Sequence, residues 1–237
     1  MSVFTYHLLK ISLYQALKNM IFPLKSKNIE GLIHAETMSA MILGSPVFSS
    51  SRFLSREIIV FAQWENDQVF DNFLASNSFG IQLTRGWYVK LEFIRQWGEI
   101  SGFQIPNETQ ENHSDENPVI AVTIAKMKFT EIPRFIRWGR PVEKLVRDHP
   151  STTLSLASIK YPNMISTFSI WKTQKEMTDM VRGHSAVPKP KRHIDAMKEH
   201  DRKNFHFEFI TLRFKPISEF GQWKGKTNLT HKNQNLE

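Results

Sequence analysis

The chain has 237 residues, of which 41% are hydrophobic, and its formal net charge is +8. This length suits one large domain or two modest ones, and the hydrophobic fraction excludes a disordered or fibrous protein. The chain has no cysteine, which excludes disulfides, zinc–thiolate sites, iron–sulfur clusters and thiolate-ligated haem. A cytoplasmic location is therefore the default expectation.

The positive charge bears on the kind of partner. A basic protein gains affinity for nucleic acid and for anionic membranes, but the basic residues of this chain are dispersed. The densest group comprises Lys189, Lys191, Arg192, Lys198, Arg202 and Lys203. We interpret this group as a solubilising face and expect no nucleic-acid partner, whereas peripheral contact with a membrane stays open. The apolar N-terminal stretch is interrupted by Lys10, Lys18 and Lys25, and a membrane-spanning helix needs roughly 18 uncharged apolar residues.

The first half of the chain is predicted to contain four strands and two helices. The strands are expected at 6–11, 32–40, 58–64 and around 91–97, and the helices at about 12–22 and in the segment ending at Ala75. In the second helix, Val69, Phe70, Phe73 and Leu74 recur at helical spacing, which places them on one face.

The second half repeats this pattern. An apolar strand ending at Trp171 precedes a helix with Met177 and Met180 on one face, as the strand ending at Trp64 does in the first half. Thr173 with Glu176 predicts a capping box at the start of that helix, and Gly183 suits its end. The other strands are expected at 119–126, 153–158 and around 212–214, with a helix at about 130–138 and another from 194 to about 203.

Each half therefore has the strand–helix–strand–strand–helix–strand order of the ferredoxin-like fold. We predict an α+β protein with two tandem βαββαβ repeats, at 1–104 and 119–225, that form an intramolecular pseudo-dimer. The polar segment 105–118 is expected to be the linker and 226–237 a flexible tail. A ligand site is expected in the cavity between the two sheets, since pockets favour domain interfaces. A homodimer through exposed sheet edges stays open.

Several short stretches occur in the order and spacing of a known enzyme family. They are Gly44–Phe48, Trp87–Val89 with Gly98, Ile124–Phe135, Thr167–Trp171, His193 and Leu212–Phe214. With these, residues of about 3–225 resemble the spheroidene monooxygenase-like family. The resemblance implies the dimeric α/β-barrel fold and a haem-dependent monooxygenase that inserts oxygen into an apolar, carotenoid-like substrate. The electron donor is not implied.

The resemblance marks His193 as the candidate axial ligand of the haem iron, in the second repeat. Histidine is the usual ligand when cysteine is absent. His193 opens a predicted helix from which its side chain is expected to point into the inter-sheet cavity, although a helix cap or a surface position is the alternative. Met197 and His200 lie on the same helical face, either as supporting groups or as a partly buried seam. His206, His184 and His34 are weaker candidates.

Arginines and aromatic residues complete the expected site. Arg134 and Arg213 are candidates for the haem propionates, because guanidinium groups suit carboxylates, although both also fit an ordinary surface role. An apolar substrate needs an aromatic lining, for which the candidates are Phe129, Phe135, Trp138, Phe168, Phe207 and Phe209. Plain core packing is the alternative for these six. A cofactor-free oxygenase, a haem dehydratase on the same fold and a non-catalytic protein that binds an apolar ligand remain alternatives.

Overall fold

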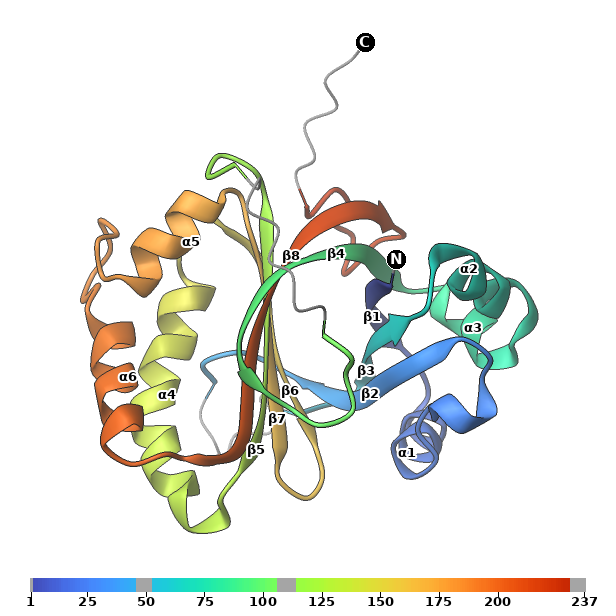
Figure 1. Ribbon diagram of the computed structural model, residues 1–237, viewed down its shortest axis with the longest axis horizontal. Helices are drawn as coiled ribbons and strands as arrows, with labels where there is room; N and C mark the ends of the chain where they lie inside the picture. The colour runs from blue at the N-terminus through green and yellow to red at the C-terminus, as the bar shows by residue number, and fades with distance from the viewer. Residues whose placement is uncertain (1, 46–52, 106–113, 231–237) are drawn as a thin grey trace.

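The computed structural model describes residues 2–45, 53–105 and 114–230 (Figure 1). Its strands are β1 (Val3–Lys10), β2 (Leu32–Met41), β3 (Phe53–Trp64), β4 (Trp87–Glu99), β5 (Val119–Met127), β6 (Thr152–Lys160), β7 (Met164–Trp171) and β8 (His206–Phe220). Its α-helices are α1 (Leu13–Ile21), α2 (Asp67–Ser76), α3 (Ser78–Leu83), α4 (Ile132–Arg147), α5 (Gln174–Val181) and α6 (Arg192–Arg202), with short 3₁₀ helices η1 (Ser26–Asn28) and η3 (Phe129–Glu131).

The eight strands form one closed barrel in the order β1-β3-β2-β6-β7-β5-β8-β4. The first half contributes β4-β1-β3-β2 and the second half contributes β8-β5-β7-β6, so both halves have the same internal order. This is the strand order of a ferredoxin-like unit, and all neighbouring strands are antiparallel. The predicted α+β fold, with two tandem βαββαβ repeats joined as a pseudo-dimer of the dimeric α/β-barrel type, is confirmed.

The two repeats meet along two seams of different length. Strands β4 and β8 pair from Tyr88 opposite Phe220 to Glu99 opposite Phe209. Strands β2 and β6 pair only from Ser39 to Met41. Along the long seam, the C-terminal half of β4 extends beyond the first repeat and pairs with β8 of the second.

Strand pairing also shows which residues are equivalent in the two repeats. Val3 pairs with Trp64 in the first repeat, and Val119 pairs with Trp171 in the second. Any residue of β1 or β3 can therefore be matched with one of β5 or β7 by its register.

The barrel interior is filled by aromatic and aliphatic side chains from both repeats. Tyr6 stacks on Phe168 with their ring centroids 3.8 Å apart, and Phe4 lies 5.0 Å from Phe214. All four side chains are fully buried. We expected a ligand cavity between the two sheets. That expectation was wrong where these four residues lie, because their large inward-facing side chains fill the space between the sheets.

The helices cover the outer face of the barrel, with α1 to α3 over the first repeat and α4 to α6 over the second (Figure 1). Thr173 caps α5 as predicted, since its hydroxyl accepts a hydrogen bond from the Glu176 amide at 3.2 Å. The capping box is only half formed, because the Glu176 carboxylate accepts from the Thr173 hydroxyl at 3.0 Å and not from the Thr173 amide. Gly183, with φ of 72°, follows α5 in the left-handed region that glycine favours. Within the described parts of the chain, no helix is both long and apolar enough to cross a bilayer.

Two sequence-based boundaries need correction. The helix expected to end near Trp138 continues to Arg147 through Pro141, and its extension buries Leu145 against the sheet. The tail expected from residue 226 onward is held as far as Thr230. Leu229 is buried in the barrel core, and its amide donates to the Glu219 carboxylate at 2.9 Å. Most of the expected linker, 106–113, and residues 231–237 lie outside the described residues.

Candidate functional site

The helices of the first repeat are packed tightly on its sheet. On this outer face, His7 and Val60 are each 1% exposed. The His7 ring stacks on Tyr88 at 5.1 Å and lies 5.6 Å from Phe70 of α2. Large side chains thus close the space between the sheet and the helices.

The same positions in the second repeat hold small residues. Thr123 corresponds to His7, Thr211 to Tyr88 and Thr167 to Val60. The hydroxyls of Thr123 and Thr211 lie 3.2 Å apart, and all three threonines are partly exposed although they lie on the helix-covered face. Together with Ala121 they form a patch of small, partly exposed side chains on the sheet face that the helices of the second repeat cover. We call the interval between this patch and the helices the sheet–helix cleft; the equivalent positions of the first repeat carry larger, buried side chains.

His193 lies at the start of α6 on the outer side of the barrel. The prediction that it points into the inter-sheet cavity was wrong, because α6 packs outside a hydrogen-bonded sheet that its side chains cannot cross. Burial lowers the pKa of His193 below its usual 6.5, and the charge of Arg213 lowers it further, against a hydrogen bond with the Val181 backbone. The ring is therefore mainly neutral at neutral pH, with a nitrogen lone pair available to a metal.

Met197 and His200 do not form one seam with His193. Met197 is 38% exposed. The His200 ring lies 5.3 Å from the ring of His206 and 5.6 Å from that of Phe209 on β8. Among the described residues, no hydrogen-bond partner reaches the ring nitrogens of His200 or His206. Burial and the neighbouring His200 lower the pKa of His206 to about 4.

Arg134 has protein partners for its donors. It donates to the Glu199 carboxylate at 2.7 Å, contacts Glu131, and lies 4.3 Å from the ring centroid of Phe205. These bonds join α4 to α6, so the geometry supports a structural role for Arg134 and not the expected contact with a propionate.

Arg213 is buried and incompletely paired. It is 7% exposed, and its Nη1 has no hydrogen-bond partner in the described part of the chain. Its guanidinium lies 4.6 Å from the ring of Trp97, and that of Arg95 lies 4.9 Å from the same ring. Sequence reasoning missed Arg95 and Trp97, since both belong to the first repeat and reach the second only along the β4–β8 seam.

The six aromatic candidates fall into three places. Phe135, Trp138 and Phe209 join one half-buried cluster around Phe205, between α4 and the sheet. Phe168 points into the barrel instead, because it alternates with the outward-facing Thr167. Phe129 and Phe207 are 58% and 67% exposed. The structure therefore brings three of the six together, beside the sheet–helix cleft.

A small pocket separates α4 from α6. It has a volume of about 220 Å³ and is lined by Arg137, Trp138, Pro141, Arg192 and Asp195. Ligand pockets usually span roughly 300–1,000 Å³, so this pocket can form only part of a binding site.

The two other candidate histidines, His34 and His184, lie apart from the cleft. His34 bonds to the Glu36 carboxylate at 3.0 Å, and His184 is exposed after α5. Within the described ranges, no group of three or more histidine, aspartate or glutamate side chains is placed to hold a metal ion by itself.

No protein-family model matches this chain. The curated spheroidene monooxygenase of Cereibacter sphaeroides is 25% identical over 174 residues, which cover 70% of this chain and 51% of that protein. The matched region thus spans about half the length of this relative.

Two solved structures share the fold. The crystal structure of the aldoxime dehydratase OxdRE in complex with butyraldoxime covers 92% of this chain and 80% of its own, with a TM-score of 0.57 and 10% identity. Another aldoxime dehydratase covers 91% and 81%, with a TM-score of 0.56 and 9% identity. Identities this low show the fold alone.

Proposed function

We propose that this protein is a haem-dependent monooxygenase that oxidises an apolar, carotenoid-like substrate. The similarity to spheroidene monooxygenase supports the reaction type and the substrate class. The observation that carries the proposal is the difference between the repeats on the helix-covered face, where Thr123, Thr167 and Thr211 are small and partly exposed and the equivalent His7, Val60 and Tyr88 are buried. Because the fold forms with large side chains at these positions, the small ones favour a binding role over a requirement of the fold.

The residues around the cleft fit a haem group. His193 presents a mainly neutral imidazole, which is the form that binds iron. Arg213 presents a buried, unpartnered guanidinium nitrogen, which suits a propionate carboxylate. Ala121, Thr123 and Thr211 present small side chains on the same face of the sheet. Among the described residues, a candidate ligand, a counter-charge and small neighbouring side chains therefore lie on one face.

Each group has a role in the proposed reaction. Haem supplies the activation of dioxygen. His193 would hold the iron, and Arg213 would orient the macrocycle through a carboxylate. Phe135, Trp138 and Phe209 would bind the apolar substrate and exclude water from it. Insertion of one oxygen atom forms a carbon–oxygen bond and reduces the other atom to water, so an external donor must supply two electrons and two protons.

The proposal is tested by titrating the purified protein with hemin and recording absorption spectra. We expect a saturable Soret band that shifts on reduction and on addition of CO. His193→Ala should weaken hemin binding about tenfold or more, because the iron loses its protein ligand. His184→Ala is the matched control, since His184 is exposed on the segment just before α6.

A wild-type protein that takes up no hemin would overturn the proposal. If hemin binds but His193→Ala retains the spectrum and the affinity, His193 is not the ligand. His200→Ala and His206→Ala then decide between the two remaining histidines next to the cleft.

Two aldoxime dehydratases have the same fold, so the fold can host dehydration, and we propose it as a second candidate function to be tested. Dehydration of an aldoxime removes water and needs neither dioxygen nor a net supply of electrons. Turnover of an aldoxime without oxygen, combined with no oxidation of a carotenoid under oxygen and reductant, would replace the monooxygenase by a dehydratase.

A further inference from the structure

Arg213 occupies the register position in the second repeat that Lys90 occupies in the first. Lys90 pairs with Thr5 in the first repeat, as Arg213 pairs with Ala121 in the second. Lys90 has two carboxylate partners on α2, at 3.1 Å from Asp67 and 2.9 Å from Asp71. The first repeat therefore neutralises the charge of Lys90 with carboxylates of its own helix α2.

The second repeat lacks these carboxylates. Counting from Trp64 and from Trp171, Asp67 corresponds to Gln174 and Asp71 to Thr178. Both replacements are uncharged. Arg213 is consequently left without an acidic partner on α5, and its Nη1 finds no acceptor among the described residues.

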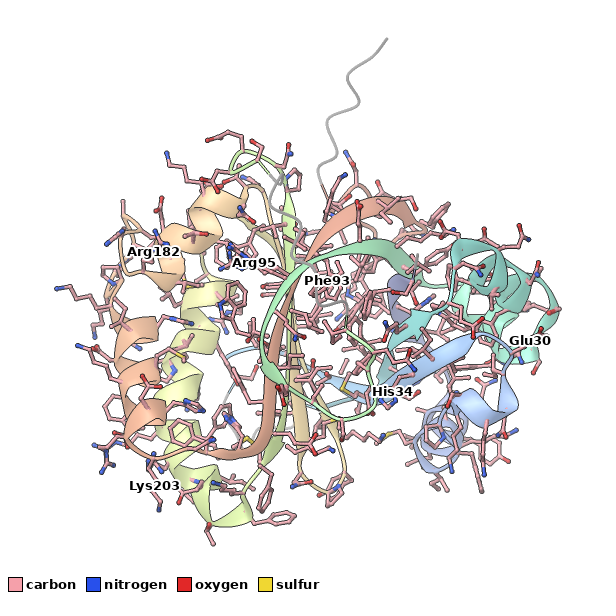
Figure 2. All side chains as sticks on the ribbon, viewed as in Figure 1. Glu30, His34, Phe93, Arg95, Arg182 and Lys203 are labelled. Carbon is pink, nitrogen blue, oxygen red and sulfur yellow. The ribbon has the colours of Figure 1, made fainter. Side chains whose placement is uncertain are left out.

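Further positive charge gathers around Arg213. Arg95 lies directly opposite it across the β4–β8 seam, and both guanidinium groups lie against the ring of Trp97. Figure 2 shows Arg95 and Arg182 at the same level of the molecule, on the side of the sheet that faces α5. The Nε of Arg95 is also buried without a partner in the described residues.

This arrangement is electrostatically unbalanced. Burial, together with the charges of Arg95 and Arg182, lowers the pKa of Arg213 to about 10, while Asp115 opposes them. Asp115 is the carboxylate that faces the group, and it accepts a hydrogen bond from Gln174 at 3.0 Å. Guanidinium groups repel one another, and one facing carboxylate, that of Asp115, leaves the three arginines with excess positive charge.

We propose that Arg95, Arg182 and Arg213 form a carboxylate-binding subsite against Trp97, at the edge of the sheet–helix cleft. Guanidinium forks bind carboxylates through two parallel hydrogen bonds. This inference rests on the proposed function in one respect, since it names the propionates of haem as the carboxylates. A free dicarboxylate would use the same chemistry.

Hemin and its dimethyl ester distinguish the two sources of carboxylate. Esterification removes both propionate charges and leaves the macrocycle intact. We expect the protein to bind hemin about tenfold more tightly than the ester, and Arg213→Met or Arg95→Met to remove this preference by weakening only hemin. Arg85→Met is the control, because Arg85 is an exposed arginine of the first repeat.

The outcomes separate this subsite from the proposed function. Equal affinity for hemin and its ester, unchanged in the arginine variants, would overturn the subsite while leaving a haem protein. If neither porphyrin binds, thermal stabilisation by succinate that Arg213→Met abolishes would support the subsite with a free dicarboxylate as its ligand, and the proposed function would fail. Binding of neither porphyrin and no effect of succinate would overturn both.

Helix α1 carries a second, independent observation. Leu13, Leu17 and Ile21 recur at helical spacing and are 50%, 50% and 68% exposed. Tyr14 and Phe22 are exposed beside them, whereas Ala16 on another side of the helix is buried where α1 meets β2 and β3. Large apolar side chains gathered on one exposed face usually mark a site of interaction.

The charge around α1 indicates what this face meets. Lys10, Lys18, Lys25 and Lys27 surround the helix in sequence, and the first acidic residue of the chain is Glu30. Figure 1 shows α1, the turn between β6 and β7, and the beginning of α4 at the same lower end of the molecule. This end also carries the exposed aromatic residues Tyr161 and Phe129.

We infer that α1 docks on a bilayer surface that contains anionic lipids. An amphipathic helix with apolar and aromatic residues on one face and lysines around it lies in the interface between headgroups and acyl chains. Anionic headgroups attract each nearby lysine. Such docking would bring the protein to the lipid bilayer, in which a long apolar substrate dissolves.

Cosedimentation with phosphatidylcholine vesicles, with and without about 30% phosphatidylglycerol, tests the inference. We expect binding to the anionic vesicles only. Changing Leu13, Leu17 and Ile21 together to Gln should reduce the bound fraction about tenfold. Changing Ile81 and Phe220 to Gln is the control, because both are exposed apolar residues outside α1.

A wild-type protein that fails to sediment with anionic vesicles would overturn membrane docking. Equal binding by the α1 variant would overturn the role of α1. If the wild type is instead a dimer that the α1 variant converts to a monomer, without any vesicle binding, the face is a self-association surface and the inference is wrong.

Discussion

Glu199 of α6 accepts a hydrogen bond from Nε of Arg134 on α4 at 2.7 Å. The same carboxylate accepts a second bond from Arg202 at 2.7 Å. Arg202 and Arg134 together lower the pKa of Glu199 to about 2. This link fixes α6, and therefore His193, relative to the helix that flanks the other side of the cleft.

Arg134→Met should destabilise the contact between the two helices. It leaves the buried Glu131 with fewer partners and removes the contact with Phe205, so we expect a loss of about 1–3 kcal/mol. Urea denaturation measures the loss, and hydrogen exchange should show faster exchange in α6. Lys198→Met, an exposed change on the same helix, should change neither quantity. Unaltered stability of Arg134→Met would show that the link is not structural.

Filling the cleft should abolish ligand binding without unfolding the protein. Thr123→His with Thr211→Tyr gives the second repeat the side chains that close the first. We expect hemin affinity to fall about tenfold or more, with a melting temperature within a few degrees of the wild type. His7→Thr in the first repeat is the reciprocal control and should lower stability without affecting hemin. Full hemin affinity in the filled variant would place the site elsewhere.

Stability should fall as the pH is lowered below 6.5. Burial lowers the pKa of His7 to about 3, so the unfolded chain takes up a proton between these two values while the folded protein does not. The resulting loss of folding free energy is negligible above pH 6.5 and amounts to about 2 kcal/mol at about pH 5. Denaturant midpoints measured above pH 6.5 and at about pH 5 give this loss.

His7→Leu should flatten this pH dependence, although His206 leaves part of it. His184→Leu should not change it, because His184 is exposed. A His7→Leu protein with the same slope as the wild type would contradict a neutral, buried His7.

Leu229→Ala should destabilise the barrel although residue 229 follows the last strand. Leu229 is 5% exposed within the barrel core, and removal of a buried leucine side chain costs about 2–5 kcal/mol. Thr227→Ala, at an exposed position, serves as the control. Thermal melting compares the two variants. Equal melting temperatures would mean that burial of Leu229 does not stabilise the barrel.

The two repeats could be predicted from the sequence because local residue patterns indicate their strands and helices. The strands ending at Trp64 and Trp171 and the cap at Thr173 each follow from residues that are close in sequence. It also marked His193, but placed it on the wrong side of the sheet, since no local pattern states that helices of both repeats pack outside the barrel.

Other errors have equally physical causes. Phe168 was grouped with the pocket, although its alternation with Thr167 predicts opposite faces. Arg95 could not be found from local sequence, because it meets Arg213 only through pairing between strands of different repeats. Comparing the two repeats could have revealed the unpaired charge of Arg213. Arg213 corresponds to Lys90, whereas Gln174 and Thr178 replace the two aspartates that neutralise Lys90.

The long β4–β8 seam has a consequence for how the molecule is made. Its partners are far apart in sequence, so it closes only after both halves have emerged from the ribosome, and such non-local pairing is slow. Arg95 comes from the first half, whereas His193 and Arg213 come from the second. A nascent chain thus brings these three residues of the proposed site together only at the end of folding, and hemin uptake would then report finished assembly.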